Sequence, residues 1–194
     1  KFHYACMLAA CLAYMASRQG DNVGLFAYNE GLCEVIPPGH RGGQLERLLQ
    51  ALTRLEPTGP ANHAQMLDVF GNQLRHRGIV VSISDMLECE DVLPEQLKHY
   101  RLRHCDALAL QVLDPDELDL PESGVMRFRD SETGREVISW PETVRGAYKS
   151  QMSDYMAGLQ TAFMRSQVDH LCLQTNESLG YALARYLHHR EAML

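Results

Sequence analysis

The chain has 194 residues, of which 45% are hydrophobic and 22% charged, as is usual for a globular protein with one sizeable buried core. Its net charge is -7, and its 18 Lys and Arg residues are scattered along the sequence instead of forming a cluster. This pattern argues against nucleic-acid binding and against docking on an anionic membrane surface, both of which need grouped basic residues.

The first predicted element is a helix over residues 2–18 that is apolar almost all round, which is typical of a helix buried in its domain. Its uncharged run, residues 4–16, is too short to cross a bilayer, which takes about 20 residues. A signal peptide is the alternative, but Ser17 and Arg18 follow the run in place of a small-residue cleavage site. Because Lys1 leads straight into this helix, we expect sequence upstream, including a first strand.

Turn residues between short apolar segments predict two antiparallel hairpins. They pair residues 23–28 with 32–36, and residues 125–129 with 136–140. Pro37 and Pro38 are expected to end the first hairpin at a sheet edge, since proline donates no ladder hydrogen bond.

Amphipathic helices alternate with buried strands through the rest of the chain. Helices are predicted over residues 45–55, 66–74 (with Asn62 as N-cap), 93–104, 142–166 and 179–187, and strands over residues 79–83, 107–113 and 170–173. The β-branched run at 79–83 is typical of a parallel strand covered on both faces. The order predicts one α/β domain over residues 1–194 with a three-layer, mostly parallel, doubly wound sheet.

Five segments carry motifs that occur together in a known family. They are K-x-x-Y-A and R-Q-G-D within residues 1–24, L-x-x-L-E-P-T-G-P within 52–67, R-G-I-V-V-S-I-S-D at 77–85, D-P-D-E-L-D-L-P at 114–121 and R-D-S-E-T-G at 129–134. Together they resemble the bacterial family of unknown function whose members carry a von Willebrand factor A-like domain. Members are often encoded near MoxR-type AAA+ ATPases, so the resemblance implies such an ATPase as protein partner. It also implies that the first strand of the sheet is missing from this chain.

The resemblance further implies a metal-ion-dependent adhesion site, where hydroxyl and carboxylate oxygens hold Mg²⁺. The family takes its ligands from an Asp-x-Ser-x-Ser loop, a Thr in a middle loop and an Asp after a later strand. Asp85 occupies the last position, whereas Ala61 stands where the Thr belongs, and the first loop would precede Lys1. Thr58 could replace the missing Thr only if its loop were rearranged. We therefore expect a partial Mg²⁺ site, with Asp85 and Thr58 as candidate ligands, and no tight binding by this chain; a loop-capping role is the alternative for Asp85.

The acidic run Asp114, Asp116, Glu117 and Asp119 is better explained as a solvated loop than as a metal site. No Gly-x-Ser-x-Gly elbow, phosphate loop or evident Cys–His pair is present, so no enzyme is predicted. The favoured function is a protein-interaction module that helps a client complex to assemble or mature. A metal-assisted hydrolase using Asp85 and Asp114 is the first alternative, and a purely structural subunit is the second.

The six cysteines include no Cys-x-x-Cys pair and most lie in apolar segments, which favours reduced, buried thiols. A reducing compartment follows from that interpretation. The sequence therefore predicts a cytoplasmic protein.

Overall fold

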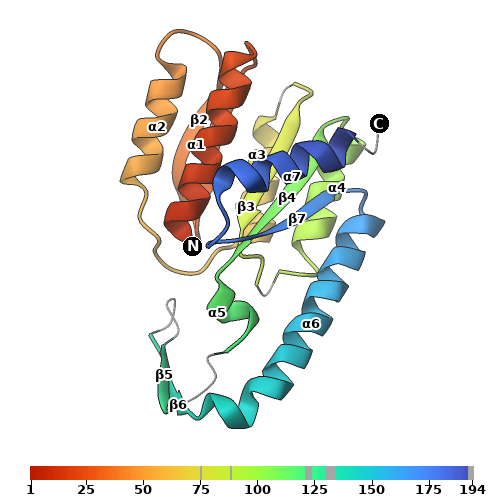
Figure 1. Ribbon diagram of the computed structural model, residues 1–194. Helices are drawn as coiled ribbons and strands as arrows, with labels where there is room; N and C mark the ends of the chain where they lie inside the picture. Colours follow the sequence, from red (N-terminus) through yellow and green to blue (C-terminus); the bar gives the residue numbers. More distant parts are fainter. Residues whose placement is uncertain (75, 88, 121–123, 130–133, 192–194) are drawn as a thin grey trace. The chain divides into compact units, whose positions relative to one another are not determined.

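A computed structural model of the protein describes residues 1–74, 76–87, 89–120, 124–129 and 134–191, with side chains as far as Arg185. The chain forms two compact units, Lys1–Arg77 (the amino-terminal unit) and Gly78–Leu194 (the carboxyl-terminal unit). Figure 1 shows the elements of each unit. The single domain over residues 1–194 stays a prediction.

The amino-terminal unit contains the three helices and the two strands expected from its sequence. They are helix α1 (Phe2–Arg18), the antiparallel hairpin β1 (Val23–Tyr28) and β2 (Leu32–Gly39), helix α2 (Gln44–Arg54) and helix α3 (His63–Gln73). The side chain of Asn62 caps α3 by accepting a hydrogen bond from the Gln65 amide at 3.2 Å, as predicted. Strand β2, however, runs through Pro37 and Pro38 to Gly39. Among the described residues β2 pairs with β1 alone, so an edge is available for residues that lack an N–H.

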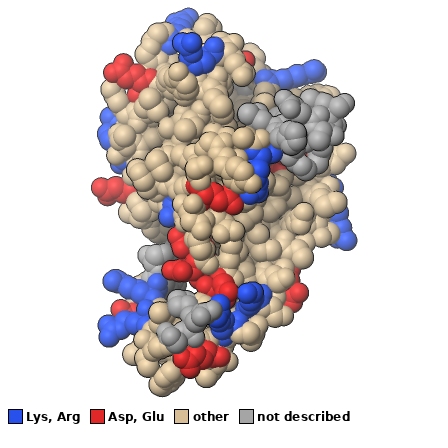
Figure 2. All heavy atoms as spheres, viewed as in Figure 1, with Lys and Arg blue, Asp and Glu red and all other residues tan. Residues whose placement is uncertain are grey.

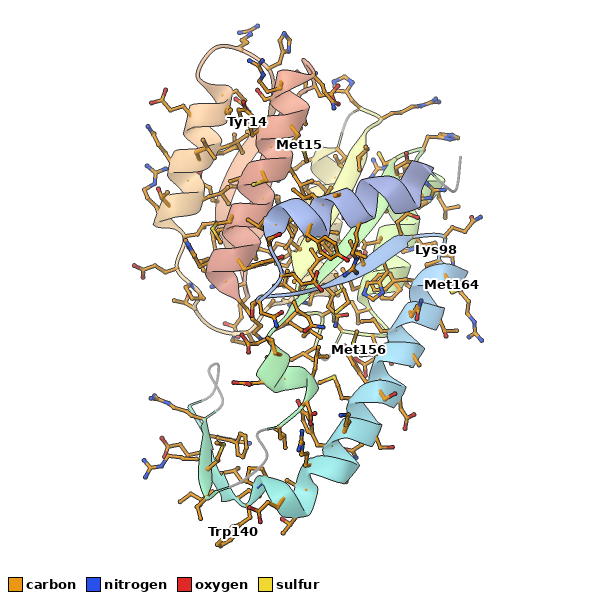
Figure 3. The ribbon with its side chains drawn as sticks, in the orientation of Figure 1. Tyr14, Met15, Lys98, Trp140, Met156 and Met164 are labelled. Atoms are coloured by element: carbon orange, nitrogen blue, oxygen red, sulfur yellow. The ribbon has the colours of Figure 1, made fainter. Side chains whose placement is uncertain are left out.

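Helix α1 is less buried than its composition suggested. A core of Ala13, Ile36, Leu48 and Ala51 joins it to β2 and α2. Only Tyr4, Leu8 and Ala13 of the helix are buried, and Tyr14, labelled in Figure 3, is 54% exposed. The prediction of a helix buried in its domain is therefore wrong, because an apolar composition does not by itself place another element over the outer face of the helix.

Gly24 lies at a bulge in the β1–β2 pairing. A Cβ atom there would come within 2.7 Å of the Ile36 carbonyl oxygen and 2.8 Å of the Pro38 nitrogen. Both are backbone atoms, so β2 would have to move, and we expect Gly24→Ala to lower the free energy of unfolding by about 1–3 kcal/mol in urea denaturation. Gly31→Ala in the turn of the same hairpin is the control, because its Cβ would meet nothing within 4 Å. Equal losses in the two variants would contradict the steric explanation.

The carboxyl-terminal unit is built on a parallel sheet of three described strands in the order β3-β4-β7. The strands are β3 (Ile79–Ser84), β4 (Asp106–Leu113) and β7 (Asp169–Gln174). The helices are α4 (Leu93–Leu102), α5 (Pro115–Leu118), α6 (Pro141–Arg165) and α7 (Leu179–Glu191), and the hairpin predicted between α5 and α6 is β5 (Met126–Arg129) with β6 (Glu136–Ser139). The prediction of an α/β fold with a parallel sheet is confirmed.

The two neighbouring strands β3 and β4 are covered differently. Every residue of β4 from Ala107 to Leu113 is buried, as expected of a central parallel strand. In β3, by contrast, Ile79 is 56% exposed and Val81 is 36% exposed. The prediction that residues 79–83 are covered on both faces is therefore wrong, since β3 lies at the edge of the described sheet and a β-branched run does not reveal its neighbours.

Helix α6 connects the β5–β6 hairpin to the sheet. Its carboxyl-terminal half buries Leu159 and Phe163, and the helix contacts β7. Trp140, at its amino-terminal end, is 56% exposed (Figure 3). The half of α6 that packs on the sheet also carries Tyr155, which contacts the loop after β3.

Candidate functional site

The carboxyl ends of β3, β4 and β7 meet at one edge of the sheet, because the three strands are parallel. Ser84 pairs with Gln111, and Leu113 pairs with Gln174. The residues that follow these strands at this edge are Asp85, Asp114 and Thr175. Asp85, the predicted metal ligand, thus lies where open α/β sheets usually place their sites.

The segment that follows β3, residues 85–87, is here named the Asp85 loop. The Asp85 carbonyl oxygen accepts a hydrogen bond from Gln111 Nε2 at 2.9 Å. Asp85 Oδ1 accepts one from the Leu87 amide at 3.3 Å, which is the capping contact considered as the alternative role of this residue. The Met86 amide donates to Ser84 Oγ at 3.1 Å. The metal role of Asp85 stays a prediction.

Met86 holds the most constrained backbone position of this loop. Its φ angle is 59° although it is not glycine, and its side chain is fully buried. Its carbonyl oxygen accepts hydrogen bonds from the Tyr155 hydroxyl and, at 3.2 Å, from Cys89 Sγ. Tyr155 reaches the loop from α6, next to Met156, which Figure 3 labels. Left-handed backbone at a bulky residue persists only where surrounding contacts enforce it, and such positions are frequent at functional sites.

Gln111 connects this loop to the interior of the sheet. Its side chain is completely buried in β4, and Oε1 lies 3.2 Å from His170 Nε2 on β7. A carbonyl oxygen only accepts, so the Gln111 atom facing Asp85 is the donor Nε2, and the atom facing His170 is the acceptor Oε1. His170 therefore carries its proton on Nε2. Its ring stacks on Phe163 at 4.8 Å between centroids, and burial lowers its pKa to about 4.

Asp114 is tied into the structure by both carboxylate oxygens. Oδ2 accepts a hydrogen bond from Thr175 Oγ1 at 2.7 Å, which links the ends of β4 and β7. Oδ1 accepts one from the Asp116 amide at 3.1 Å, and Glu117 Oε2 accepts one from the Asp114 amide at 2.8 Å. This reciprocal pair is a capping box at the start of α5. The role that the structure gives Asp114 is that of a cap and a strand link.

Asp119 shows that the acidic run is not merely solvated, as the sequence had suggested. Arg145 on α6 donates two hydrogen bonds to it, from Nε at 2.7 Å and Nη2 at 2.8 Å, and Lys149 Nζ lies 3.0 Å away. These hydrogen bonds hold the pKa of the Asp119 carboxyl well below its usual range. Tyr148 also donates to the Glu117 carbonyl oxygen at 2.6 Å, so α6 anchors this segment at two points.

Thr58, the second candidate metal ligand, belongs to the amino-terminal unit, whereas Asp85 belongs to the carboxyl-terminal unit. Asn29 Nδ2 donates to the Thr58 carbonyl oxygen at 2.9 Å and to Oγ1 at 3.3 Å. The Asn29 carbonyl oxygen accepts from the Asn62 amide at 3.0 Å, next to Ala61. Asn29 thus holds both ends of residues 58–62, the segment that carries the Thr ligand in the family pattern. The role of Thr58 as a metal ligand stays a prediction.

Sequence reasoning found Asp85 and Asp114 but missed Gln111, Tyr155 and Thr175. A polar residue in the middle of the apolar run at 107–113 was the available signal for Gln111, since a buried amide needs partners. Nothing in the local sequence marks the other two. Within the described residues, no group of three or more His, Cys, Asp and Glu side chains is placed to hold a metal ion.

Residues 1–157 match the family model described as "Protein of unknown function DUF58". The chain belongs to the DUF58 family. It is similar to the uncharacterized proteins Mb1516 of Mycobacterium bovis and Rv1480 of Mycobacterium tuberculosis, at 29% identity over 134 residues. The match covers 67% of this chain but only 41% of either mycobacterial protein. The predicted resemblance to a bacterial family of unknown function is confirmed.

Two solved structures have a similar fold. One is the conserved hypothetical protein BatB from Bacteroides thetaiotaomicron, with a TM-score of 0.62 over 96% of this chain and 86% of that chain. The other is an aerotolerance-related membrane protein from Bacteroides fragilis, with a TM-score of 0.61 over 94% of this chain and 86% of that chain. Sequence identity to each is 13%, so the likeness concerns the fold.

These neighbours overturn the prediction of a cytoplasmic protein, since one of them is described as a membrane protein. The prediction rested on cysteine usage and composition in this DUF58 chain. Composition and cysteine usage do not by themselves determine where a polypeptide is located. In the described part of the chain, no helix has both the length and the apolar character needed to cross a bilayer.

Proposed function

We propose that this DUF58 chain is a protein-interaction module and not an enzyme, with a von Willebrand factor A-like, doubly wound architecture. Its partner would bind at the carboxyl edge of the parallel sheet, where Asp85 lies. The observation that carries the proposal is the fixed conformation of the Asp85 loop. A loop held in one conformation before binding loses little conformational entropy when a partner docks.

A basic surface is not required for this interaction. On the face shown in Figure 2, acidic and basic side chains are interspersed, which suits a protein partner better than a polyanion. A MoxR-type AAA+ ATPase is the partner that the family resemblance implies, and assembly or maturation of a client complex would be the outcome.

Mg²⁺ fits the described residues only in part. A carboxylate is a suitable hard ligand, and Mg²⁺ is often held by one or two carboxylates with water in its other positions. Asp85 offers one such group, while Thr58 Oγ1 already accepts a hydrogen bond from Asn29. We therefore expect weak metal binding at most and assign no step of the interaction to a bound ion.

Asp85→Asn tests the proposal without disturbing the loop. The amide oxygen can still accept from the Leu87 amide, but the negative charge and the hard metal ligand are lost. We expect the affinity for the ATPase partner to fall about tenfold or more, measured by calorimetry on the full-length protein with and without Mg²⁺. Asp91→Asn removes the charge of an exposed Asp further along the chain and is the control.

Two outcomes would count against the proposal. If the full-length protein does not bind any MoxR-type ATPase, the proposed partner is wrong. If Asp85→Asn binds as well as the unchanged protein, the carboxyl edge at Asp85 is not the interface.

The metal-assisted hydrolase remains the second candidate, because Asp85 and Asp114 follow adjacent strands at the same edge. Against it, both carboxylate oxygens of Asp114 accept structural hydrogen bonds. Phosphoester or ester turnover that disappears in Asp85→Asn would favour the hydrolase over the interaction module.

A further inference from the structure

Two separate parts of the carboxyl-terminal unit contact the Asp85 loop, and a third contacts one of them. Gln111 reaches its first carbonyl from β4, and Tyr155 reaches its second carbonyl from α6. His170 on β7 contacts Gln111 from the other side. Two local hydrogen bonds also hold the loop. The Met86 amide donates to Ser84 Oγ, and the Leu87 amide donates to Asp85 Oδ1.

The orientation of the Gln111 amide decides whether this arrangement works. Free rotation would allow either its oxygen or its nitrogen to face the Asp85 carbonyl, and oxygen facing oxygen is repulsive. The Asp85 carbonyl oxygen can only accept, so it fixes the amide nitrogen on its own side, and the amide oxygen then faces His170 Nε2 at 3.2 Å. Full burial of Gln111 removes water as a competing partner.

We propose that Gln111, supported by its contact with His170, is a positioning residue that holds the Asp85 carbonyl, while Tyr155 holds the left-handed Met86 next to it. Together they fix the direction in which the Asp85 carboxylate points at the sheet edge. The consequence for partner binding rests on the proposed function, whereas the consequence for the loop does not.

Gln111→Glu tests the hydrogen bond that Gln111 Nε2 donates to the Asp85 carbonyl oxygen. The two side chains have nearly the same shape, and an oxygen still faces His170. At a pH where the Glu carboxyl is ionised, the group facing the Asp85 carbonyl is an acceptor in place of a donor. We expect the amides of Met86 and Leu87 to exchange hydrogen about 10- to 100-fold faster, the range expected for the loss of a buried hydrogen bond. Gln160→Glu, on the exposed side of α6, makes the same chemical change as a control.

Tyr155→Phe is the second variant, in case a carboxylate at position 111 prevents folding. It removes the hydroxyl that bonds to the Met86 carbonyl and keeps the ring. The same two amides are expected to exchange faster than in the unchanged protein. Amides of β4 from Ala107 to Leu110 provide the internal reference, because they report on global opening.

The comparison between loop and strand amides decides the inference. Faster exchange confined to the Met86 and Leu87 amides supports the inference that Gln111 and Tyr155 position the Asp85 loop. Faster exchange by the same factor in β4 would overturn it, since Gln111 would then stabilise the fold as a whole.

Partner binding is measured separately on the same variants. If the unchanged protein binds no ATPase, the proposed function fails while the exchange data still decide the role of Gln111. If it binds, a Gln111→Glu protein with a loosened loop and unchanged affinity would overturn the link between the loop and binding.

Discussion

Phe163→Ala is expected to lower the free energy of unfolding by about 3–5 kcal/mol, the usual cost of removing a large aromatic side chain from a core. Phe163 is fully buried near the end of α6, and its ring stacks on His170. The substitution leaves a cavity between α6 and β7 and exposes one face of the imidazole. Urea denaturation monitored by circular dichroism would measure the loss.

Phe163→Leu is the matched control, because it keeps most of the buried volume and should cost clearly less than alanine. Met164→Ala, one residue further along the helix, removes a side chain that is 71% exposed and should change stability by about 0.5 kcal/mol or less. A loss below about 1 kcal/mol for Phe163→Ala would mean that α6 does not depend on this contact with the sheet.

Stability should also depend on pH through His170. Burial lowers its pKa in the folded protein to about 4, from 6.5 for an ordinary histidine. Between these two pH values the unfolded chain binds a proton that the folded protein excludes. The contribution of His170 to the free energy of unfolding is therefore fully present above about pH 6.5. It is lost as the pH falls towards 4, by about 3 kcal/mol in total.

His170→Gln should remove this dependence. The Gln amide can donate to Gln111 but does not titrate. The slope of unfolding free energy against pH should therefore decrease between pH 6.5 and 4, by an amount that corresponds to at most one proton bound on unfolding. His99→Gln on the exposed face of α4 is the control. Urea denaturation at half-unit pH steps measures both, and an unchanged slope in His170→Gln would show that another group is responsible.

The sequence predicted the local elements well because each has a local cause. Leucines at helical spacing mark α2, Asn62 caps α3, and turn residues mark both hairpins. It also predicted Asp85 at the end of a buried-type strand, since strand ends are visible in the change from apolar to polar residues. The wrong predictions, burial of α1 within its domain and coverage of β3 on both faces, concern which faces meet other elements.

What the sequence alone determined is the order of elements, the parallel α/β class and the position of Asp85 after β3. Family membership followed from motifs that the sequence also contains. Only the tertiary structure decided that Gln111, Tyr155 and Thr175 contribute to the carboxyl edge, and that Asp114 serves there as a cap. The reason is physical: propensity and capping act over a few residues, whereas the bond from Tyr155 to Met86 joins residues 69 positions apart. Contacts of that range exist only after the strands and helices have packed.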